Sequence, residues 1–343
     1  MKDFFRYDTM EGRKSLLNRA RNVALTALQQ YDLAWERIQY IQLSDTITYK
    51  VDTSTSDSYL LRIHSDRWSK EEIQSELIFL QSLNAVDEIL VPVGIASLTG
   101  SLVLEVDTIE GYRKPYVTVM KWVEGEHVQG EITGALVSRM GSMMGKLHEA
   151  VSGLNLPPNF VRPVWGADSF RGEIAKLERY YTRFLSDQAW TEYQHAVEKI
   201  LSTLSGMVKN GQNYGIIHAD LHADNIVFKD DLPYPIDFGR CGFGYFLYDL
   251  AGSLMGLYPR ERMTFIQGYE NVRRLGTDYI RDLECFFIMF MIETYCHHAS
   301  NPEESTRLMD EQPYAQAYIR EFLKGNPFLF VPVEPVDMDK VQQ

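Results

Sequence analysis

Apolar and polar residues alternate along one part of the chain, and this alternation predicts strands. Residues 37–65 (RIQYIQLSDTITYKVDTSTSDSYLLRIHS) are also rich in Ile, Tyr, Thr and Val, which favours three strands separated by turns. Two further strands are predicted within residues 101–109 (SLVLEVDTI) and 114–123 (KPYVTVMKWV). Together they predict an antiparallel sheet of about five strands, a common size.

Helical spacing of apolar residues prevails in the rest of the chain. It predicts helices over residues 12–33, 133–149, 174–208 and 260–275. Residues 284–296 are apolar nearly all round, which predicts a central, buried helix. The segment after Gly325 is punctuated by prolines and is predicted to be extended.

The two patterns divide the chain into a strand-rich part and a helical part, which defines an α+β fold class. We expect an N-terminal lobe over residues 1–120, consisting of a helical extension, the sheet and one further helix. A linker is expected over residues 121–125, followed by a helical lobe over residues 126–343.

The helix that follows the third strand carries a buried charge. Ser69 and Glu72 form the S-x-x-E pattern of a capping box at its start. Glu76 falls within the apolar stripe of this helix, which is formed by Ile73, Leu77, Leu80 and Leu83. Because an unpaired buried carboxylate is strongly destabilising, Glu76 is expected to pair with a cation, and Arg62 in the preceding strand (YLLRIH) is the nearest candidate.

Composition narrows the function without defining it. The 343 residues carry a net charge of −13, which disfavours sequence-independent nucleic-acid binding. The first residues have no apolar signal core, and no apolar block is long enough to cross a membrane. Three scattered cysteines do not make a disulfide framework, so we expect a cytoplasmic protein, whose oligomeric state the sequence leaves open.

The densest cluster of chemically active side chains lies in the stretch GIIHADLHADNIVFKDDLPYPIDFG, which begins at Gly215. An apolar run leads to His218 and Asp220, and Asn225 precedes a second apolar run. A turn then reverses the chain and brings Asp237 back beside Asn225. A carboxylate and an amide oxygen that converge in this way form a hard-oxygen site suited to Mg²⁺.

This geometry suits phosphoryl transfer, which needs a metal ion on the phosphates and a residue that orients the attacking hydroxyl. The pattern H-x-D-x-x-x-x-N followed by D-F-G matches the catalytic loop and metal motif of kinases. An arginine in a strand and a glutamate in a helix precede it in the order that kinases require. Each half of the pattern is weak alone, but the combination is specific.

On these motifs the chain resembles the aminoglycoside phosphotransferase and choline kinase family of kinase-like small-molecule phosphotransferases. The resemblance covers most of the chain, including YLLRIH, SELIFLQSL, VMKWVEGE and GKLHEA. It implies a bilobal, protein-kinase-like fold with ATP between the lobes. It also implies that Asp220 is the catalytic base or a carboxylate that orients the hydroxyl, that Asn225 and Asp237 hold Mg²⁺, and that Arg62, paired with Glu76, contacts the α- and β-phosphates.

Further roles are implied by the same resemblance. The stretch VMKWVEG would join the lobes, with backbone groups of Met120, Lys121 and Trp122 binding adenine. His218 is a candidate catalytic residue, although a bracing role in the catalytic loop is the simpler interpretation. His222 is open between a structural and a substrate-facing role, and Asp249 is expected to tie down the loop or cap the following helix.

The chain also departs from relatives of this fold. Arg62 stands where the family usually has lysine, and Ala219 stands where protein kinases have the arginine of H-R-D. The stretch LSDTITYKV contains no glycine, so a G-x-G-x-x-G loop over the phosphates is missing. Asp224 occupies a position that is usually glycine, and its extra charge is unexplained.

The expected function is ATP- and Mg²⁺-dependent transfer of the γ-phosphoryl group to a hydroxyl of a small molecule. Aminoglycosides, choline-like and homoserine-like alcohols and sugars all remain candidates, with or without an amine. Two alternatives stay open, which are a protein Ser/Thr kinase of the same fold and a nucleotide-binding pseudokinase with a regulatory role.

Overall fold

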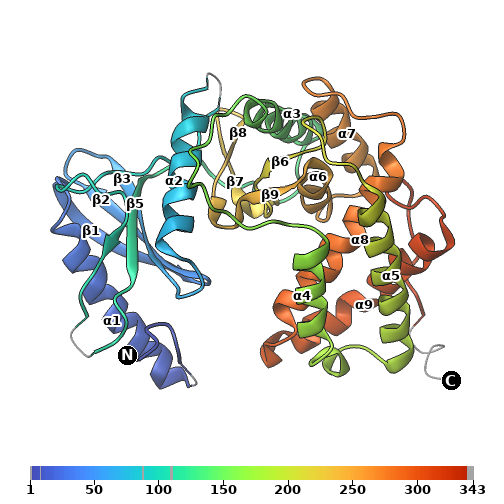
Figure 1. Cartoon of the computed structure of the whole chain (residues 1–343), viewed down its shortest axis with the longest axis horizontal. Coiled ribbons are helices and arrows are strands. Elements are labelled where there is room, and N and C mark those ends of the chain that lie inside the picture. Colours follow the sequence, from blue (N-terminus) through green and yellow to red (C-terminus); the bar gives the residue numbers. More distant parts are fainter. Residues whose placement is uncertain (1, 8, 87–88, 109–110, 338–343) are drawn as a thin grey trace. The chain divides into compact units, whose positions relative to one another are not determined.

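The computed structural model describes residues 2–7, 9–86, 89–108 and 111–337. The chain forms two compact units (Figure 1). The first unit contains Met1–Glu124 and Leu154–Arg162, and the second contains Gly125–Gly153 and Pro163–Gln343. The sequence pattern placed all residues after 125 in one lobe, whereas the structure groups Leu154–Arg162 with the first unit.

The first unit is built on a five-stranded antiparallel sheet of order β1-β2-β3-β5-β4, as predicted. Its strands are β1 (Trp35–Leu43), β2 (Thr46–Thr53), β3 (Ser58–His64), β4 (Leu104–Glu105) and β5 (Tyr116–Lys121). Within the described residues, strand β4 is much shorter than the strand predicted within residues 101–109. The paired residues end at Glu105 and Tyr116. Beyond them the Val106 N–H still donates to the Pro115 carbonyl at 3.1 Å, but Pro115 has no N–H to donate in return.

Each face of this sheet carries a different helix. Helix α1 (Met10–Leu28) buries Leu16, Val23 and Ala24 in one apolar cluster with Leu61 and Val119 of the sheet (Figure 1). Successive strand residues point to opposite faces, so the neighbours of Leu61 point to the other face.

On that second face Arg62 stands between Thr48 and Thr118 in the strand register. It meets helix α2 (Lys70–Asn84), which begins with the predicted capping box of Ser69 and Glu72. The sheet therefore holds an apolar core on one side and an ion-pair cluster on the other.

The second unit is mainly helical and is organised around one apolar helix. Its helices are α3 (Gly134–Val151), α4 (Ala167–Leu177), α5 (Asp187–Gly206), α6 (Phe246–Leu254), α7 (Pro259–Glu270), α8 (Tyr279–His298) and α9 (Ser305–Lys324), with 3-10 turns η1 (Tyr181–Arg183), η2 (Ala223–Asn225), η3 (Phe238–Arg240) and η4 (Pro302–Glu304). Helix α8 is buried almost all round and packs against α4, α5, α6 and α9, which confirms its predicted central place.

The predicted single helix over residues 174–208 is wrong. The structure has two helices there, because the chain turns inward at Phe184 and Leu185 and both side chains are buried. Ser186 then caps the next helix, and its side chain accepts a hydrogen bond from the N–H of Ala189. The helical spacing of apolar residues continues across the break because both helices bury apolar faces in the same core.

Helices α3 and α7 approach so closely that their backbones touch. A Cβ atom on Gly141 would lie 2.0 Å from the carbonyl oxygen of Phe265, and one on Gly268 would lie 2.1 Å from that of Ser138. Glycine is required at both positions for this contact. The close contact fixes His148 of α3 beside Tyr269 of α7, which matters for the site described below.

Two short ladders carry the motif residues of the second unit. The predicted hairpin is present as β7 (Ile226–Lys229) and β8 (Leu232–Pro235). Its turn residues Asp230 and Asp231 both have positive φ (51° and 60°), as a two-residue hairpin turn requires. The second ladder pairs β6 (Tyr214–Ile217) with β9 (Gly242–Tyr245), so the residues that follow β6 and precede β9 come together.

Candidate active site

The catalytic-loop motif of the second unit is held by hydrogen bonds of its own backbone and side chains. The Asn225 Nδ2 donates to the backbone carbonyl of Asp220 at 2.8 Å. The N–H of Ile236 donates to the carbonyl of Asn225 at 2.9 Å, at the point where β7 begins and β8 ends. Asp237 follows directly, so the hairpin brings it beside Asn225, as the sequence predicted.

The two carboxylates of the motif are not sealed in the core. The Asp220 side chain is 29% exposed, and Asp237 is exposed as well. Asp237 adopts a left-handed conformation with φ 58° and ψ 63°, which aspartate tolerates better than most residues. Both groups are therefore open to a ligand from the surface of this unit.

The oxygen atoms of this motif fit a divalent metal that arrives with a nucleotide. Because the Asn225 Nδ2 is engaged by the Asp220 carbonyl, the amide oxygen is the atom that remains for a metal ion. Among the described residues no group of three or more His, Cys, Asp and Glu side chains could hold a metal ion by itself. Mg²⁺ commonly binds through one or two carboxylates together with substrate phosphates, which matches this donor set.

His218 is fully buried, and its hydrogen bonds connect the two strands of the motif. Its Nε2 donates to the carbonyl of Ile236 at 2.9 Å, and its ring lies 4.4 Å from that of Phe238. Its backbone N–H donates to Asp249 at 2.7 Å. This environment supports the bracing interpretation of His218 over a catalytic one, since the ring contacts the residues on either side of Asp237.

The Asp249 carboxylate of α6 holds the backbone of the catalytic loop. Its carboxylate accepts the N–H groups of His218 at 2.7 Å and of Ala219 at 2.6 Å. It also accepts the Nε2–H of His148 at 3.1 Å. Ala219 has φ 64°, an uncommon conformation for a residue with a side chain, and the bond to Asp249 helps to hold it there.

His148 extends this anchor into the helical core. Its Nδ1 accepts the hydroxyl hydrogen of Tyr269 at 3.0 Å, so both ring nitrogens are engaged. Burial lowers the pKa of His148, and the neighbouring Asp249 carboxylate opposes this shift. The structure thus assigns Asp249 to holding the loop, one of the two roles expected from the sequence.

His222 and Asp224 form the exposed rim of the loop. The His222 Nε2 lies 3.2 Å from the Asn225 Nδ2 and 3.9 Å from the Asp220 carboxylate. Its Nδ1 lies 3.6 Å from Asp224, whose side chain is 93% exposed. The charge of Asp224 is therefore solvated, and it faces His222.

The predicted ion pair of the first unit is present. The Arg62 Nη2 donates to the Glu76 Oε1 at 2.6 Å, and both side chains are buried. The structure adds a residue that the sequence did not indicate, because Arg162 places its Nη1 4.0 Å from the Glu76 Oε2. No sequence pattern linked Arg162 to this cluster, since it lies 86 residues beyond Glu76.

The stretch predicted to bind adenine belongs to β5 and its end. Met120 is buried and pairs with Leu60. The N–H of Lys121 donates to Val93 at 2.7 Å, and that of Trp122 donates to Ser58 at 3.0 Å. Adenine would therefore have to use the carbonyl groups of this stretch or backbone groups after Trp122.

A second cluster that the sequence did not indicate lies beneath the D-F-G segment. The Tyr248 hydroxyl donates to the Glu293 Oε2 at 2.5 Å, and the Glu293 Oε1 is buried without a hydrogen-bond partner among the described residues. Burial raises the pKa of Glu293 to about 7, although the bond from Tyr248 opposes the shift. Trp165 stacks on Tyr248 and donates to the carbonyl of Arg240 at 3.0 Å, which ties this cluster to the residue after D-F-G.

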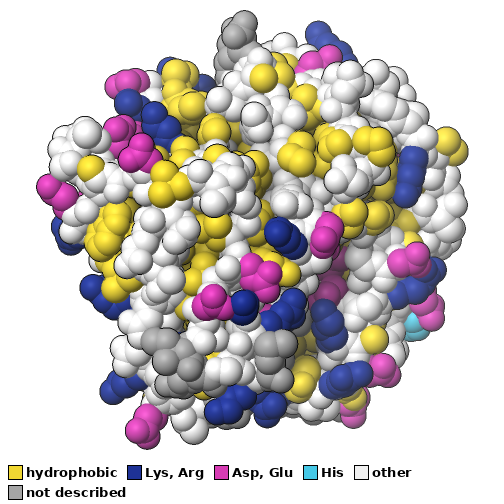
Figure 2. Space-filling view, turned by 60° about the vertical axis from the view of Figure 1, so that its left-hand side comes forward, with side chains coloured by type: hydrophobic (Ala, Val, Ile, Leu, Met, Phe, Trp, Pro, Cys, Tyr) yellow, Lys and Arg dark blue, Asp and Glu magenta, His cyan; other side chains and the backbone are white. Residues whose placement is uncertain are grey.

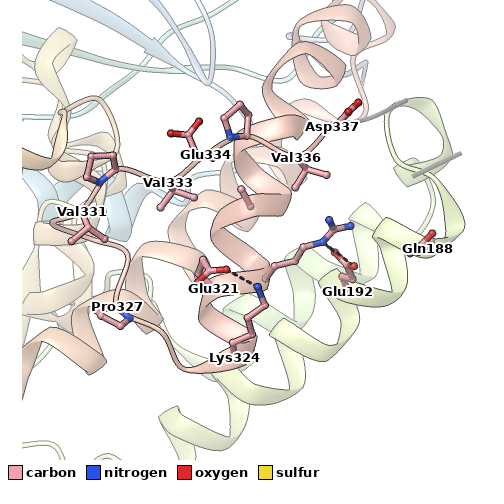
Figure 3. A pocket seen from close by; sticks show the side chains of 14 residues that line it. Gln188, Glu192, Glu321, Lys324, Pro327, Val331, Val333, Glu334, Val336 and Asp337 are labelled. Atoms are coloured by element: carbon pink, nitrogen blue, oxygen red, sulfur yellow. Dashed lines mark hydrogen bonds and ion pairs between the residues drawn. The ribbon is translucent and has the colours of Figure 1, made fainter. Parts of the chain in front are cut away.

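The second unit also contains a cavity apart from the motif residues. This cavity of about 870 Å³ is lined by α5, α9 and the C-terminal segment, including Gln188, Glu334 and Val336 (Figure 3). Its charged side chains Arg320 and Glu192 pair with each other at 2.9 Å. No predicted site residue lines it.

On the face drawn in Figure 2, basic side chains lie among acidic ones. Exposed pairs such as Arg67 with Asp45 and Lys114 with Asp107 follow this pattern in the first unit. Within the described ranges, no helix is long and apolar enough to cross a membrane.

The fold and the motif define a class. An antiparallel sheet with an Arg–Glu pair, a helical unit and an H-x-D-x-x-x-x-N loop followed by D-F-G are the features of a protein-kinase-like phosphotransferase. The profile of the phosphotransferase enzyme family matches residues 42–283, well over half of the chain. The chain belongs to this family and is an enzyme of the phosphoryl-transfer class.

Individual relatives agree with this assignment. The chain is 24% identical over 242 residues to the amicoumacin kinase of Bacillus subtilis (strain 168), which covers 69% of this chain and 68% of that protein. A microcompartment-associated aminopropanol kinase superposes with a TM-score of 0.79 at 22% identity, covering 90% of this chain and 99% of the other.

An amicoumacin kinase solved with AMP-PNP, Ca²⁺ and Ami gives a TM-score of 0.75 at 20% identity, covering 96% and 99% of the two chains. A spectinomycin phosphotransferase solved with ADP and spectinomycin gives a TM-score of 0.62 at 15% identity, covering 88% and 96%. These likenesses show that the fold is the kinase-like fold predicted from the sequence.

Proposed function

We propose that this protein transfers the γ-phosphoryl group of ATP, with Mg²⁺, to a hydroxyl group of a small molecule. The observation that carries the proposal is the convergence of Asp220, Asn225 and Asp237 on one hydrogen-bonded loop and hairpin. The known ligands of relatives support it, because an amicoumacin kinase binds a nucleotide analogue with a divalent cation, and a spectinomycin phosphotransferase binds ADP.

In the proposed mechanism Asp220 accepts the proton of the acceptor hydroxyl while the hydroxyl oxygen attacks the γ-phosphorus. The new bond joins that oxygen to phosphorus, and the bond from phosphorus to the β-γ bridging oxygen breaks to release ADP. Mg²⁺, when bound, would neutralise charge on the phosphates. Asn225 and Asp237 would hold it through side-chain oxygens, and Arg62 would contact the α- and β-phosphates.

The chemistry of phosphoryl transfer determines what the residues of the protein contribute to catalysis. Phosphoryl transfer asks for little covalent help from the protein, so most of the rate enhancement would come from positioning and charge neutralisation. The anchoring of His218 and Ala219 by Asp249 serves positioning, because it fixes the backbone just before Asp220. The acceptor class that fits this proposal is an alcohol, with an amine-bearing alcohol as the first choice for testing, since the relatives include an aminopropanol kinase.

The test is a turnover screen with the full chain, Mg·ATP and a panel of alcohols. The panel contains amino alcohols, choline-like alcohols, aminoglycosides, sugars and a generic protein substrate, and ADP release is measured with and without each compound. We expect ADP release that depends on at least one small alcohol and that yields its phosphate ester. Phosphorylation of the generic protein alone would favour a protein kinase, and Mg·ATP binding with no acceptor-dependent turnover would favour a pseudokinase.

A further inference from the structure

Arg162 reaches the Arg62–Glu76 pair from a distant part of the chain. It is the last residue of Leu154–Arg162, the segment that belongs to the first unit although the residues on either side belong to the second. Its side chain is buried, with 5% of the residue exposed. Its Nη1 lies 4.0 Å from the Glu76 Oε2, while Arg62 holds the Glu76 Oε1.

Several contacts fix Arg162 against α2. Its Nη1 donates to the carbonyl of Glu72 at 3.1 Å, one turn before Glu76. Its guanidinium lies over the ring of Trp68, 5.0 Å from the centroid. The preceding N–H, of Val161, donates to the Ser75 hydroxyl at 2.9 Å. The guanidinium is thus held in one place beside the Glu76 carboxylate.

The charges of the cluster explain why a second arginine matters. In the Arg62–Glu76 pair the carboxylate offsets part of the attraction of the arginine for a phosphate. Arg162 adds a second guanidinium beside Glu76, in a buried setting where charges are weakly screened. His64 is affected by the same charges. Burial and the charges of both arginines lower the pKa of His64 well below its usual value.

The first unit lacks the usual alternative source of phosphate binding. The turn between β1 and β2 contains Ser44 and Asp45 in place of glycines. The N–H of Ser44 donates to the Thr46 carbonyl, and Asp45 pairs with Arg67 at 2.7 Å. This turn therefore adds a carboxylate where a glycine-rich loop would offer backbone N–H groups to phosphate.

We propose that Arg162 is a positioning residue for the nucleotide phosphates, whose guanidinium lies 4.0 Å from the second oxygen of Glu76 and attracts it electrostatically while the first oxygen orients Arg62. Its positive charge also adds to the attraction that Arg62 offers to phosphate. This inference rests on the proposed function, because it assigns Arg62 to the phosphates. A purely structural role, in which Arg162 only anchors the segment to α2, is the alternative that an experiment must separate.

The experiment compares the binding of Mg·ATP with that of adenosine by calorimetry on the full chain. Arg162→Met removes the charge, and we expect the dissociation constant for Mg·ATP to rise on the order of tenfold. Adenosine has no phosphate, so its dissociation constant should change by less than about twofold. In turnover assays KM for ATP should rise more than kcat falls.

Two further variants make the result decisive. Arg162→Lys keeps the charge, and it should recover most of the Mg·ATP affinity even if the methionine variant does not fold. Arg21→Met removes an exposed arginine of α1, which packs on the face of the sheet opposite Arg62, and should leave both affinities unchanged.

Three outcomes would overturn the inference. These are unchanged Mg·ATP affinity in Arg162→Met, an equal loss of affinity for adenosine and Mg·ATP, and a lysine variant no better than the methionine variant. Wild-type protein that binds no Mg·ATP would instead refute the proposed function itself, and the inference with it.

Discussion

Each unit of the protein contains a buried carboxylate at the centre of its site residues, and the two carboxylates are neutralised in different ways. Asp249 in the second unit accepts two backbone N–H groups and one imidazole N–H. Glu76 in the first unit faces two arginines. The carboxylate in the second unit thus holds the shape of a backbone, whereas the one in the first unit holds cationic side chains in place.

Glu293 is a buried acid with fewer hydrogen-bond donors, although the charge of Arg240 also acts on it. It accepts one hydrogen bond, from the neutral Tyr248 hydroxyl, and its other oxygen has no partner among the described residues. Burial consequently raises its pKa to about 7. Glu293 thus differs from Asp249 and Glu76 in how few donors reach its oxygens.

The largest effect is expected from Asp249→Asn, which leaves one carbonyl oxygen to serve the N–H groups of His218 and Ala219. A buried donor left unpaired destabilises by about 1–3 kcal/mol. Because Ala219 would no longer be held at positive φ, Asp220 should shift, and a small misplacement can lower turnover about 100-fold. Chemical denaturation and turnover assays measure the two effects.

Asp168→Asn is the matched control, because the Asp168 side chain is fully exposed in the same unit. It should leave both quantities unchanged. Wild-type turnover in Asp249→Asn would show that the loop keeps its shape without this anchor.

The second effect concerns the pH dependence of stability through Glu293. Its pKa in the folded protein is about 7, against an ordinary value of 4.5, so the folded state keeps the proton to higher pH than the unfolded chain. The stabilising contribution of Glu293 is therefore complete below pH 4.5 and is lost as the pH rises toward 7. At about 1.4 kcal/mol per pH unit the loss is roughly 3 kcal/mol.

Unfolding of wild-type protein and of Glu293→Gln, measured from pH 5 to pH 8, checks this contribution. The variant should lose less stability over this range than the wild type, while Glu198→Gln, which changes an exposed residue of α5, should follow the wild type. Parallel curves for wild type and Glu293→Gln would mean that Glu293 titrates normally.

The smallest expected effect is a difference between the pKa values of two buried histidines, His64 near Glu76 and His148 beside Asp249. The charges of Arg62 and Arg162 add to burial at His64, whereas Asp249 opposes burial at His148. Both rings should remain neutral below the usual pKa, and His64 should do so to lower pH. In Arg162→Met the pKa of His64 should rise and that of His148 should stay the same, as measured by NMR titration of the imidazole signals. Equal shifts at both histidines would remove the proposed difference between the sites.

Much of the fold was predictable because local patterns and tertiary structure agree. The alternation in residues 37–65, the capping box of Ser69 and Glu72 and the buried position of Glu76 each led to the observed element or pair. The hairpin that joins Asn225 to Asp237 was also predictable, since both partners lie within one short stretch. In each of these cases the interacting residues lie close together in the sequence.

The rest depends on contacts between distant residues, which spacing along the chain does not encode. Arg162 meets Glu76 only because Leu154–Arg162 belongs to the first unit. His148 of α3 meets Asp249 of α6 across 101 residues of sequence, and Tyr248 meets Glu293 where α6 packs on α8. The helix break at residues 178–186 was not predictable for a different reason. The helices on both sides of the break bury apolar faces in the same core, so the apolar spacing does not reveal it.

The most direct test of phosphoryl transfer by this protein is the turnover of Asp220→Asn, measured beside its affinity for Mg·ATP. The acceptor is the alcohol with the highest wild-type turnover in the screen. We predict that Mg·ATP affinity stays within about threefold of wild type while turnover falls about 100- to 10,000-fold, the usual contribution of a general base. Turnover close to wild type with Mg·ATP still bound would contradict the assignment of Asp220 and the mechanism built on it.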